Sequence, residues 1–241
     1  MIDKVHGNRF CGELNWYIVE MWKELIKGWI PEIITKEQYK NYYLNDYYNK
    51  DYTRSYGDEI LAAHKRIQAY EGFLKGKILD VGCGLGGFVD LLREKKFDCW
   101  GQEITFLSKD VSTYQSEIED INFPTDYFQT VTLHDVLEHI IDPIVFLKEV
   151  FRLTSQEGHV IIDFPNFFCE AGQKHWRKTQ HLWMFDYKQL AHLLKSVGFT
   201  IIKMTEPIPG KIVYYYRNQN KIELRFFFLR VLEIFIGFLL N

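Results

Sequence analysis

The chain contains few cysteines, and their spacing matches neither a disulfide framework nor a metal finger. There is no C-x-x-C pair among the four, which are Cys11, Cys83, Cys99 and Cys169. Small secreted scaffolds and zinc-binding modules need closely spaced cysteines. The sequence therefore argues against both classes and predicts a reduced, cytoplasmic setting.

The chain also lacks an excess of charge of one sign. It has 29 Lys and Arg against 32 Asp and Glu, which gives a formal net charge of −3. Domains that bind nucleic acid usually carry a basic patch or stripe, so the sequence predicts no DNA partner and disfavours RNA. The first ten residues, MIDKVHGNRF, are polar where a secretory signal needs an apolar run, and we do not expect secretion.

A length of 241 residues suits one α/β domain with additions at both ends. We expect an N-terminal helical and tyrosine-rich extension over residues 1–57, a main domain over 58–216 and a hydrophobic tail over 217–241. Residues 13–27 place apolar side chains at the spacing of an amphipathic helix. The tyrosines of residues 41–56 fit two interpretations equally well: a lid over a substrate pocket, or an aromatic brace that packs the extension onto the core.

The tail is the most hydrophobic segment, LRFFFLRVLEIFIGFLL over residues 224–240. It is too short and too charged for a membrane-spanning helix, which needs roughly 20 predominantly apolar residues. On a helical wheel Arg225, Arg230 and Glu233 fall within one arc and the rest of the circumference is apolar. Such a helix suits a peripheral position in a membrane interface, a homodimer contact, or docking on its own domain.

The stretch KGKILDVGCGLGGFVDLL, residues 75–92, predicts a strand, a tight glycine turn and a helix. Glycines let the backbone approach a ligand closely, and the N–H groups at the start of the helix point at the same place. Gly82, Gly84 and Gly87 also satisfy the dinucleotide pattern G-x-G-x-x-G. Asp80 distinguishes a dinucleotide from a ligand with an amino-acid part. A carboxylate there would repel the pyrophosphate of a dinucleotide and attract the ammonium group of an amino acid.

A second predicted strand, residues 97–104, ends in Glu103 about twenty residues beyond the glycine turn. An acidic residue at this place in a nucleotide-binding α/β unit hydrogen-bonds ribose hydroxyls. The segment that follows, residues 105–116, is short for a full helix. Glu117 is the candidate for the adenine contact.

ILDVGCGLGG resembles the first motif of the class I S-adenosylmethionine-dependent methyltransferases. INFPTDYFQTVTL (121–133), HDVLEHI (134–140), FLKEVFRL (146–153) and HVIIDFPN (159–166) then follow in that family's order. The resemblance spans roughly residues 76–202 and is closest to the branch with the ubiquinone-pathway O-methyltransferases. The ordered motifs therefore favour a methyltransferase over a nicotinamide-dependent oxidoreductase.

This resemblance implies a doubly wound, mostly parallel, seven-stranded Rossmann-like sheet with a reversed edge, preceded by the N-terminal helical extension and followed by a C-terminal hydrophobic helix. It also implies S-adenosylmethionine as the cofactor. The residues expected to bind it are Asp80, Gly82, Cys83, Gly84, Gly86, Glu103, Glu117 and His134.

Methyl transfer to a hydroxyl needs a base, or a metal that lowers the pKa of the hydroxyl. His139 and His181 are the candidate bases. Asp135, Glu138 and His139 stand at i, i+3 and i+4, a spacing that puts them on one face of a helix. Three interpretations of these residues remain open. His139 or His181 is a metal-free base or a substrate contact, the set holds a metal, or Glu138 and His139 form a purely structural pair.

The set resembles the E-x-x-E-H metal motif of ubiquinone-pathway O-methyltransferases, with Asp135 in place of the first Glu. With His181 added, it resembles the four-ligand site of small-RNA 3′-end 2′-O-methyltransferases. Asp135, Glu138, His139 and His181 would then hold Mg²⁺, Mn²⁺ or Zn²⁺.

The sequence thus predicts O-methylation of a small-molecule, sugar or lipid-linked hydroxyl. One alternative is a metal-dependent RNA 2′-O-methyltransferase. The other belongs to a different class, a catalytically silent cofactor-binding protein that serves as a membrane-associated assembly factor.

Overall fold

The computed structural model describes residues 36–51, 54–105, 113–166, 181–183, 185, 187–208 and 211–218. The helix predicted over 13–27 and the hydrophobic helix predicted over 224–240 lie outside these ranges and stay predictions. No helix in the described ranges has the length and apolar character needed to cross a membrane.

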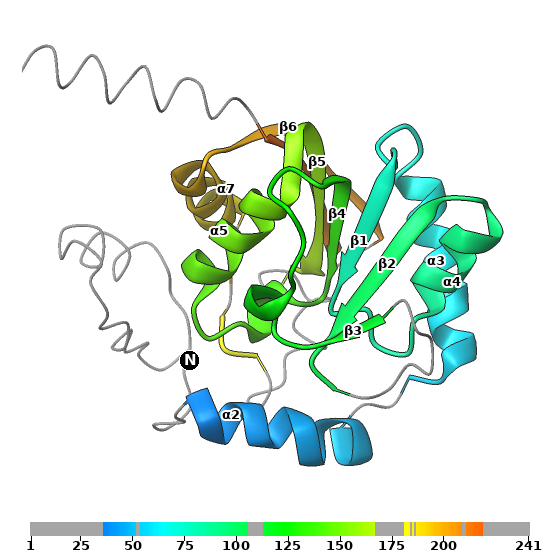
Figure 1. The fold of residues 1–241 in the computed structure, drawn as a ribbon, viewed down its shortest axis with the longest axis vertical. Coiled ribbons are helices and arrows are strands. Elements are labelled where there is room, and N and C mark those ends of the chain that lie inside the picture. The colour runs from blue at the N-terminus through cyan, green and yellow to red at the C-terminus, as the bar shows by residue number, and fades with distance from the viewer. Residues whose placement is uncertain are drawn as a thin grey trace, which may run out of the picture.

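A seven-stranded sheet forms the centre of the described chain, with strand order β3-β2-β1-β4-β5-β7-β6 (Figure 1). The strands are β1 (Lys77–Val81), β2 (Asp98–Glu103), β3 (Thr113–Gln115), β4 (Phe128–His134), β5 (Thr154–Pro165), β6 (Phe199–Ile208) and β7 (Lys211–Asn218). Strands β3, β2, β1, β4 and β5 are parallel, and β7 is antiparallel to both β5 and β6. The predicted mostly parallel α/β sheet is confirmed.

The structure corrects two details of the sheet. The reversed strand is predicted at the edge, whereas β7 lies one strand inside and β6 forms the edge. Because β6 ends at Ile208 and β7 begins at Lys211, the two strands pair antiparallel, and the other side of β7 pairs with β5. The segment after Glu103 also contributes β3, which the sequence does not reveal because only Thr113–Gln115 pair with β2.

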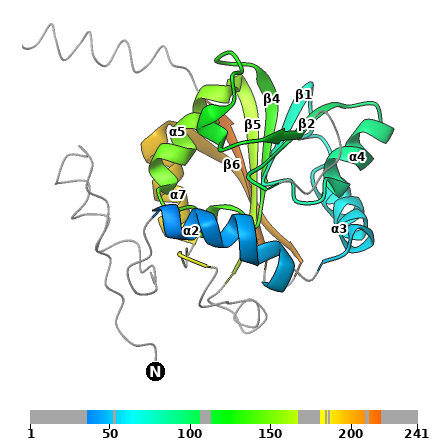
Figure 2. The same cartoon turned by 60° about the horizontal axis from the view of Figure 1, so that its bottom comes forward.

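Helices cover both faces of the sheet, with α3 and α4 on one face and α5 and α7 on the other (Figures 1 and 2). The helices are α2 (Lys36–Tyr42), α3 (Tyr56–Ala69), α4 (Gly87–Glu94), α5 (Pro143–Leu153) and α7 (Tyr187–Val197). A π-helix, η1 (Tyr43–Asp51), continues α2, and two 3-10 turns are η2 (Ile118–Asp120) and η3 (Leu137–His139). The described chain is therefore doubly wound.

The side chains of β1 alternate between two hydrophobic clusters. Leu79 and Val81 pack into the cluster that contains α5 and α7, and Ile78 packs into the cluster that contains α3 and α4. Both clusters are buried, as expected for a parallel strand covered on both faces. Since successive side chains of a strand point to opposite faces, Asp80 lies on the side of α3 and α4, next to the glycine turn.

The glycine turn depends on backbone conformations that only glycine adopts without strain. Gly82 has a φ of 69°, and a Cβ there would lie 2.5 Å from a methyl carbon of Val136. Gly84 has a φ of 58°. The chain can therefore leave β1, turn sharply and start α4 at Gly87 only with glycines at these positions.

Candidate active site

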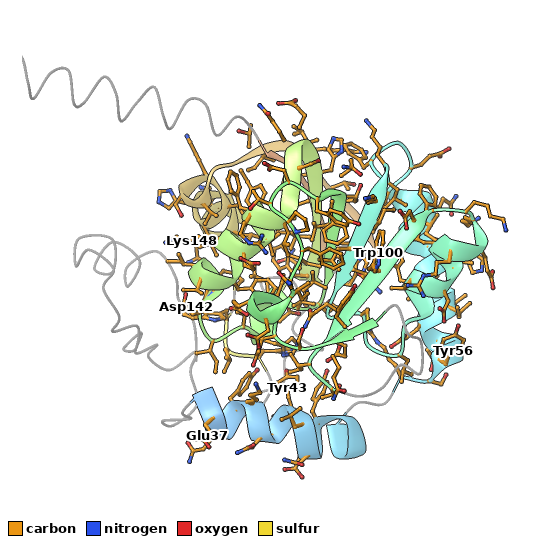
Figure 3. The ribbon with its side chains drawn as sticks, viewed as in Figure 1. Glu37, Tyr43, Tyr56, Trp100, Asp142 and Lys148 are labelled. Carbon is orange, nitrogen blue, oxygen red and sulfur yellow. The ribbon has the colours of Figure 1, made fainter. Side chains whose placement is uncertain are left out.

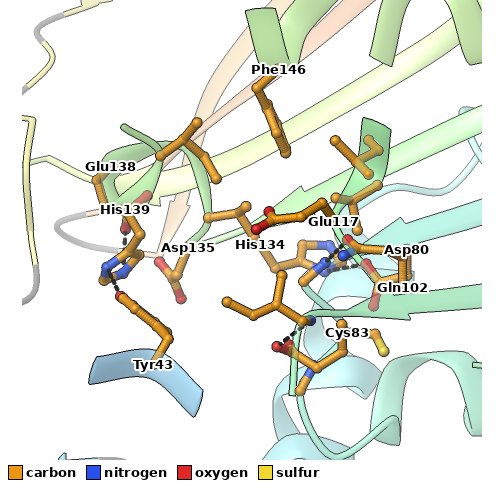
Figure 4. A pocket seen from close by; sticks show the side chains of 18 of the residues that line it. Tyr43, Asp80, Cys83, Gln102, Glu117, His134, Asp135, Glu138, His139 and Phe146 are labelled. Atoms are coloured by element: carbon orange, nitrogen blue, oxygen red, sulfur yellow. Dashed lines mark hydrogen bonds and ion pairs between the residues drawn. The ribbon is translucent and has the colours of Figure 1, made fainter. Parts of the chain in front are cut away.

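A cavity of about 640 Å³ lies at the carboxyl ends of β1, β2 and β4 (Figure 4). This is the edge of a doubly wound sheet at which ligands bind. The cavity brings together the predicted site residues Asp80, Gly82, Cys83, Gly84, Glu103, Glu117, His134, Asp135, Glu138, His139 and His181. Gly86 is not among the lining residues; it caps the start of α4 with a φ of 91°.

The glycine turn is held by two carboxylates. Glu103 accepts a hydrogen bond from the Gly84 N–H at 3.1 Å. Glu59, in the first turn of α3, accepts from the N–H groups of Leu85 at 3.0 Å and Gly87 at 3.1 Å. The sequence does not reveal Glu59, because it precedes the turn by a whole helix and no spacing links them.

Two acidic side chains line the cavity from the end of β2 and from the start of η2. Glu103 is buried, and it also accepts from the Ile104 N–H at 2.9 Å. Glu117 forms an ion pair with Lys40 of α2 at 3.0 Å. Both residues thus line the cavity, and the ribose role of Glu103 and the adenine role of Glu117 stay predictions.

Cys83 lines the cavity as a neutral thiol. Burial raises its pKa well above the usual range, and the neighbouring carboxylates of Asp80 and Glu103 raise it further. A thiol in such surroundings is a packing group rather than a nucleophile.

Asp80 is buried and is held from β4. Its Oδ1 accepts from the Thr132 hydroxyl at 2.7 Å and lies 3.0 Å from His134 Nδ1. The His134 ring stacks on Tyr70 with a centroid distance of 5.7 Å and meets the edge of Phe88 at 4.6 Å. His134 therefore packs beside Asp80 between aromatic rings.

The helical face predicted for Asp135, Glu138 and His139 is not formed. Strand β4 ends at His134, Asp135 has a φ of 55°, and only Leu137–His139 follow as a 3-10 turn. The prediction is wrong because the i, i+3, i+4 pattern assumes an α-helix that begins only at Pro143, where Asp142 caps the N–H groups of the first turn.

Asp135 instead belongs to a network of charged side chains that runs from the exposed Arg54 to the buried Asp163. Its Oδ2 lies 3.3 Å from Arg66 Nη2 and 3.5 Å from Arg54 Nη2. Arg66 Nε lies 3.0 Å from Asp163 Oδ2, which also accepts from the Tyr70 hydroxyl at 3.3 Å. Burial alone would lower the pKa of Arg66, but Asp163 and Asp135 outweigh it and the pKa is raised.

Glu138 and His139 lie together at the end of the cavity away from Asp80 (Figure 4), and His181 joins them there. One candidate ligand atom from each lies within 4.8 Å of the others. Glu138 Oε1 and His139 Nε2 are 3.9 Å apart, and the two imidazole centroids are 4.8 Å apart. The Glu138 carbonyl accepts from the N–H groups of Leu182 and Trp183, which brings His181 to the turn.

Tyrosines from α2 and η1 close this half of the cavity. Tyr39, Tyr43 and Tyr47 line it, and the Tyr43 hydroxyl lies 2.6 Å from His139 Nδ1. Tyr43 points toward the domain whereas Glu37 points away (Figure 3). Burial raises the pKa of Tyr43 well above its usual range, so it is a neutral phenol.

Residues 48–204 match the family model of a methyltransferase domain. No protein of curated function matches the chain. Among solved structures, an S-adenosylmethionine-dependent methyltransferase from Archaeoglobus fulgidus is 18% identical with a TM-score of 0.57, covering 66% of this chain and 94% of its own. A protein from Pyrococcus horikoshii is 18% identical with a TM-score of 0.58, covering 77% and 100%. An S-adenosylmethionine-dependent methyltransferase from Methanosarcina mazei is 17% identical with a TM-score of 0.50, covering 64% and 98%.

Proposed function

Because this chain belongs to the methyltransferase domain family and is an S-adenosylmethionine-dependent methyltransferase, we propose that it methylates a hydroxyl of a small-molecule, sugar or lipid-linked acceptor. The proposal follows the resemblance to the ubiquinone-pathway O-methyltransferases. The observation that carries it is the gathering of Glu138, His139 and His181 beyond the cofactor half of the cavity.

The cofactor half fits the chemical groups of S-adenosylmethionine. Asp80 would offer a carboxylate to the ammonium group, Gly82 would allow close approach of the backbone, and Glu103 would accept from the ribose hydroxyls; all three residues line the cavity. The bound cofactor supplies an activated methyl group. The protein's own task is then to hold the acceptor in line and to remove its proton.

His139 and His181 are proposed to take that proton. A general base must come within hydrogen-bond reach of the acceptor hydroxyl, and both imidazoles line the cavity. Glu138, whose Oε1 lies 3.9 Å from His139 Nε2, would stabilise the imidazolium that forms. Tyr43 fixes the orientation of the His139 ring through Nδ1.

The apolar part of the cavity lining favours an acceptor with an apolar body. Ile140, Ile141, Val145 and Phe146 are among the residues that line the cavity. Apolar walls with a few convergent polar groups are typical of small-molecule sites. A phenolic or lipid-linked hydroxyl would bury its apolar part here and present its oxygen to the imidazoles.

Calorimetric titration with S-adenosylhomocysteine tests the cofactor site. We expect saturable binding by the wild type and binding about tenfold weaker in Glu103→Ala, because a hydrogen bond to a charged group is lost. Glu94→Ala, at the exposed end of α4, is the matched control and should bind like the wild type. An absence of binding by the wild type would refute the proposed function.

A second candidate uses the same three groups to hold a divalent cation. One buried carboxylate and two imidazoles with ligand atoms within 4.8 Å form a donor set that suits Zn²⁺ or Mn²⁺. Such a cation would lower the pKa of the acceptor hydroxyl. Asp135, the fourth ligand expected from the resemblance, faces Arg66 and Arg54 instead.

Titration with Zn²⁺ and Mn²⁺ separates the two candidates. The metal candidate predicts one cation per chain, at least tenfold weaker binding in Glu138→Gln, and unchanged binding in Asp135→Asn, because the loss of a ligand group weakens a metal site. The metal-free candidate predicts no specific binding and full activity after treatment with EDTA. Equal loss in both variants would favour the four-ligand arrangement that the sequence predicts.

A further inference from the structure

We infer that His134 is a positioning residue that turns the carboxylate of Asp80 toward the ammonium group of the cofactor. The inference rests on the proposed function and concerns the cofactor half of the same cavity. His134 would act through Asp80 and not by contact with the cofactor. Both side chains are mostly buried, 5% exposed for His134 and 2% for Asp80.

The contacts of the Asp80 carboxylate are one-sided. Thr132 Oγ1 donates to Oδ1 at 2.7 Å, and His134 Nδ1 lies 3.0 Å from the same oxygen. Both groups come from β4, which pairs with β1 in parallel and keeps Asp80 opposite Thr132 in the register. Within the described ranges the two contacts fall on Oδ1 alone, and Asp80 lines the cavity. Oδ2 is therefore the oxygen presented to a ligand.

The chemistry of the pair fixes the proton on His134. A carboxylate can only accept hydrogen bonds, so Nδ1 must carry the hydrogen. The other nitrogen, Nε2, is buried and has no hydrogen-bond partner among the residues that the structure describes. Buried N–H groups without a partner are rarer in folded proteins than buried acceptors without one. The hydrogen is therefore assigned to Nδ1, from which His134 donates to Oδ1 of Asp80.

The aromatic neighbours hold the imidazole in this orientation. The ring lies nearly parallel to Tyr70, at 11°, and Phe88 meets it at 76°. Phe88 belongs to α4, the helix that follows the glycine turn. Without His134, Oδ1 of Asp80 would keep one donor from β4, the Thr132 hydroxyl. The carboxylate would lose the second contact that fixes its orientation.

The test compares two ligands that differ in the amino-acid part. S-adenosylhomocysteine carries the ammonium group that Asp80 would bind, and 5′-methylthioadenosine lacks it. We expect His134→Phe, which keeps an aromatic ring and removes the donor, to bind S-adenosylhomocysteine about tenfold more weakly and to leave the affinity for 5′-methylthioadenosine unchanged. Asp80→Asn should show the same selectivity, and His134→Asn, whose amide can donate to Oδ1, should restore most of the loss.

Equal weakening of both ligands in His134→Phe would overturn the inference, since it would mean that the ring only packs the turn. An unchanged affinity for both ligands would overturn it as well. Thr132→Val removes the other donor to Oδ1 and should weaken S-adenosylhomocysteine alone, which provides a second test if His134→Phe does not fold. Failure of the wild type to bind either ligand would refute the cofactor site and the role of His134 with it, whereas a failure confined to the predictions for the variants would overturn the role of His134 alone.

Discussion

Replacement of Arg66 by methionine is expected to lower the free energy of unfolding by about 3 kcal/mol or more. Arg66 is the cation between two carboxylates, with Nε 3.0 Å from Asp163 and Nη2 3.3 Å from Asp135. Its side chain is 12% exposed and that of Asp163 is 2% exposed. Methionine fills much of the same volume but removes this partner from the partly buried carboxylate of Asp135 and from the buried carboxylate of Asp163. Leaving a buried charge without its partner costs more than the ion pair contributes.

Urea unfolding of the wild type and the variant measures the effect. Arg54→Met is the matched control, because Arg54 faces the same Asp135 at 3.5 Å from a side chain that is 46% exposed. An exposed ion pair contributes at most about 1 kcal/mol. Similar losses in both variants would contradict the argument from burial.

A second substitution distinguishes two causes of the loss of stability: the buried Asp163 carboxylate left without its partner, and the lost packing of the Arg66 side chain. In the double variant Arg66→Met with Asp163→Asn, the buried negative charge beside Arg66 is removed. The stability should then recover in part, with a coupling of about 1 kcal/mol or more between the two sites. Simple additivity would mean that Arg66 stabilises the domain by its apolar contacts alone.

The sequence predicts the parts of the fold that depend on local patterns. The apolar run of β1, the glycine turn and the amphipathic helix α4 are all visible in residues 75–92, and the structure confirms them. Strand β3 is missed because three residues carry too little pattern. The inner position of β7 is missed because the residue pattern of a strand does not determine which strands it pairs with.

The position of a site residue is predictable where it follows from a local pattern. Asp80 stands next to the glycines in the sequence and lines the cavity in the structure, while its role toward an ammonium group, inferred from its charge, stays a prediction. Asp135 is misplaced because the sequence argument assumes an α-helix where the structure has a left-handed residue and a 3-10 turn. Glu59 and Arg66 cannot be found from sequence, because their partners are brought to them only by the packing of α3.

Tyr43 shows why the tyrosine-rich segment left two interpretations open. It belongs to the main hydrophobic cluster, as a brace would, and it also lines the cavity and contacts His139, as a lid would. A residue pattern cannot separate these roles, because one buried aromatic side chain can pack against the core with its ring and reach the site with its hydroxyl.

Substitution of His139 by glutamine is expected to slow methyl transfer by roughly 10²–10⁴-fold, the usual contribution of a general base. Glutamine keeps a polar group near Tyr43 but cannot accept a proton from a hydroxyl. The affinity for S-adenosylhomocysteine should not change, because His139 lies in the other half of the cavity from Asp80 (Figure 4). Single-turnover transfer to an acceptor from a screen of phenolic, sugar and lipid-linked hydroxyls measures the rate.

Two further histidine variants decide what a loss of rate would mean. His192→Gln, exposed on α7, should behave as the wild type. If His181→Gln is as slow as His139→Gln, the two imidazoles act as one unit, because residues that act together give non-additive losses.

If both variants keep the wild-type rate and cofactor affinity, neither imidazole is the base. If both also complement a deletion in cells and no acceptor is ever methylated, the cavity holds the cofactor without using it, and the catalytically silent assembly role becomes the better explanation.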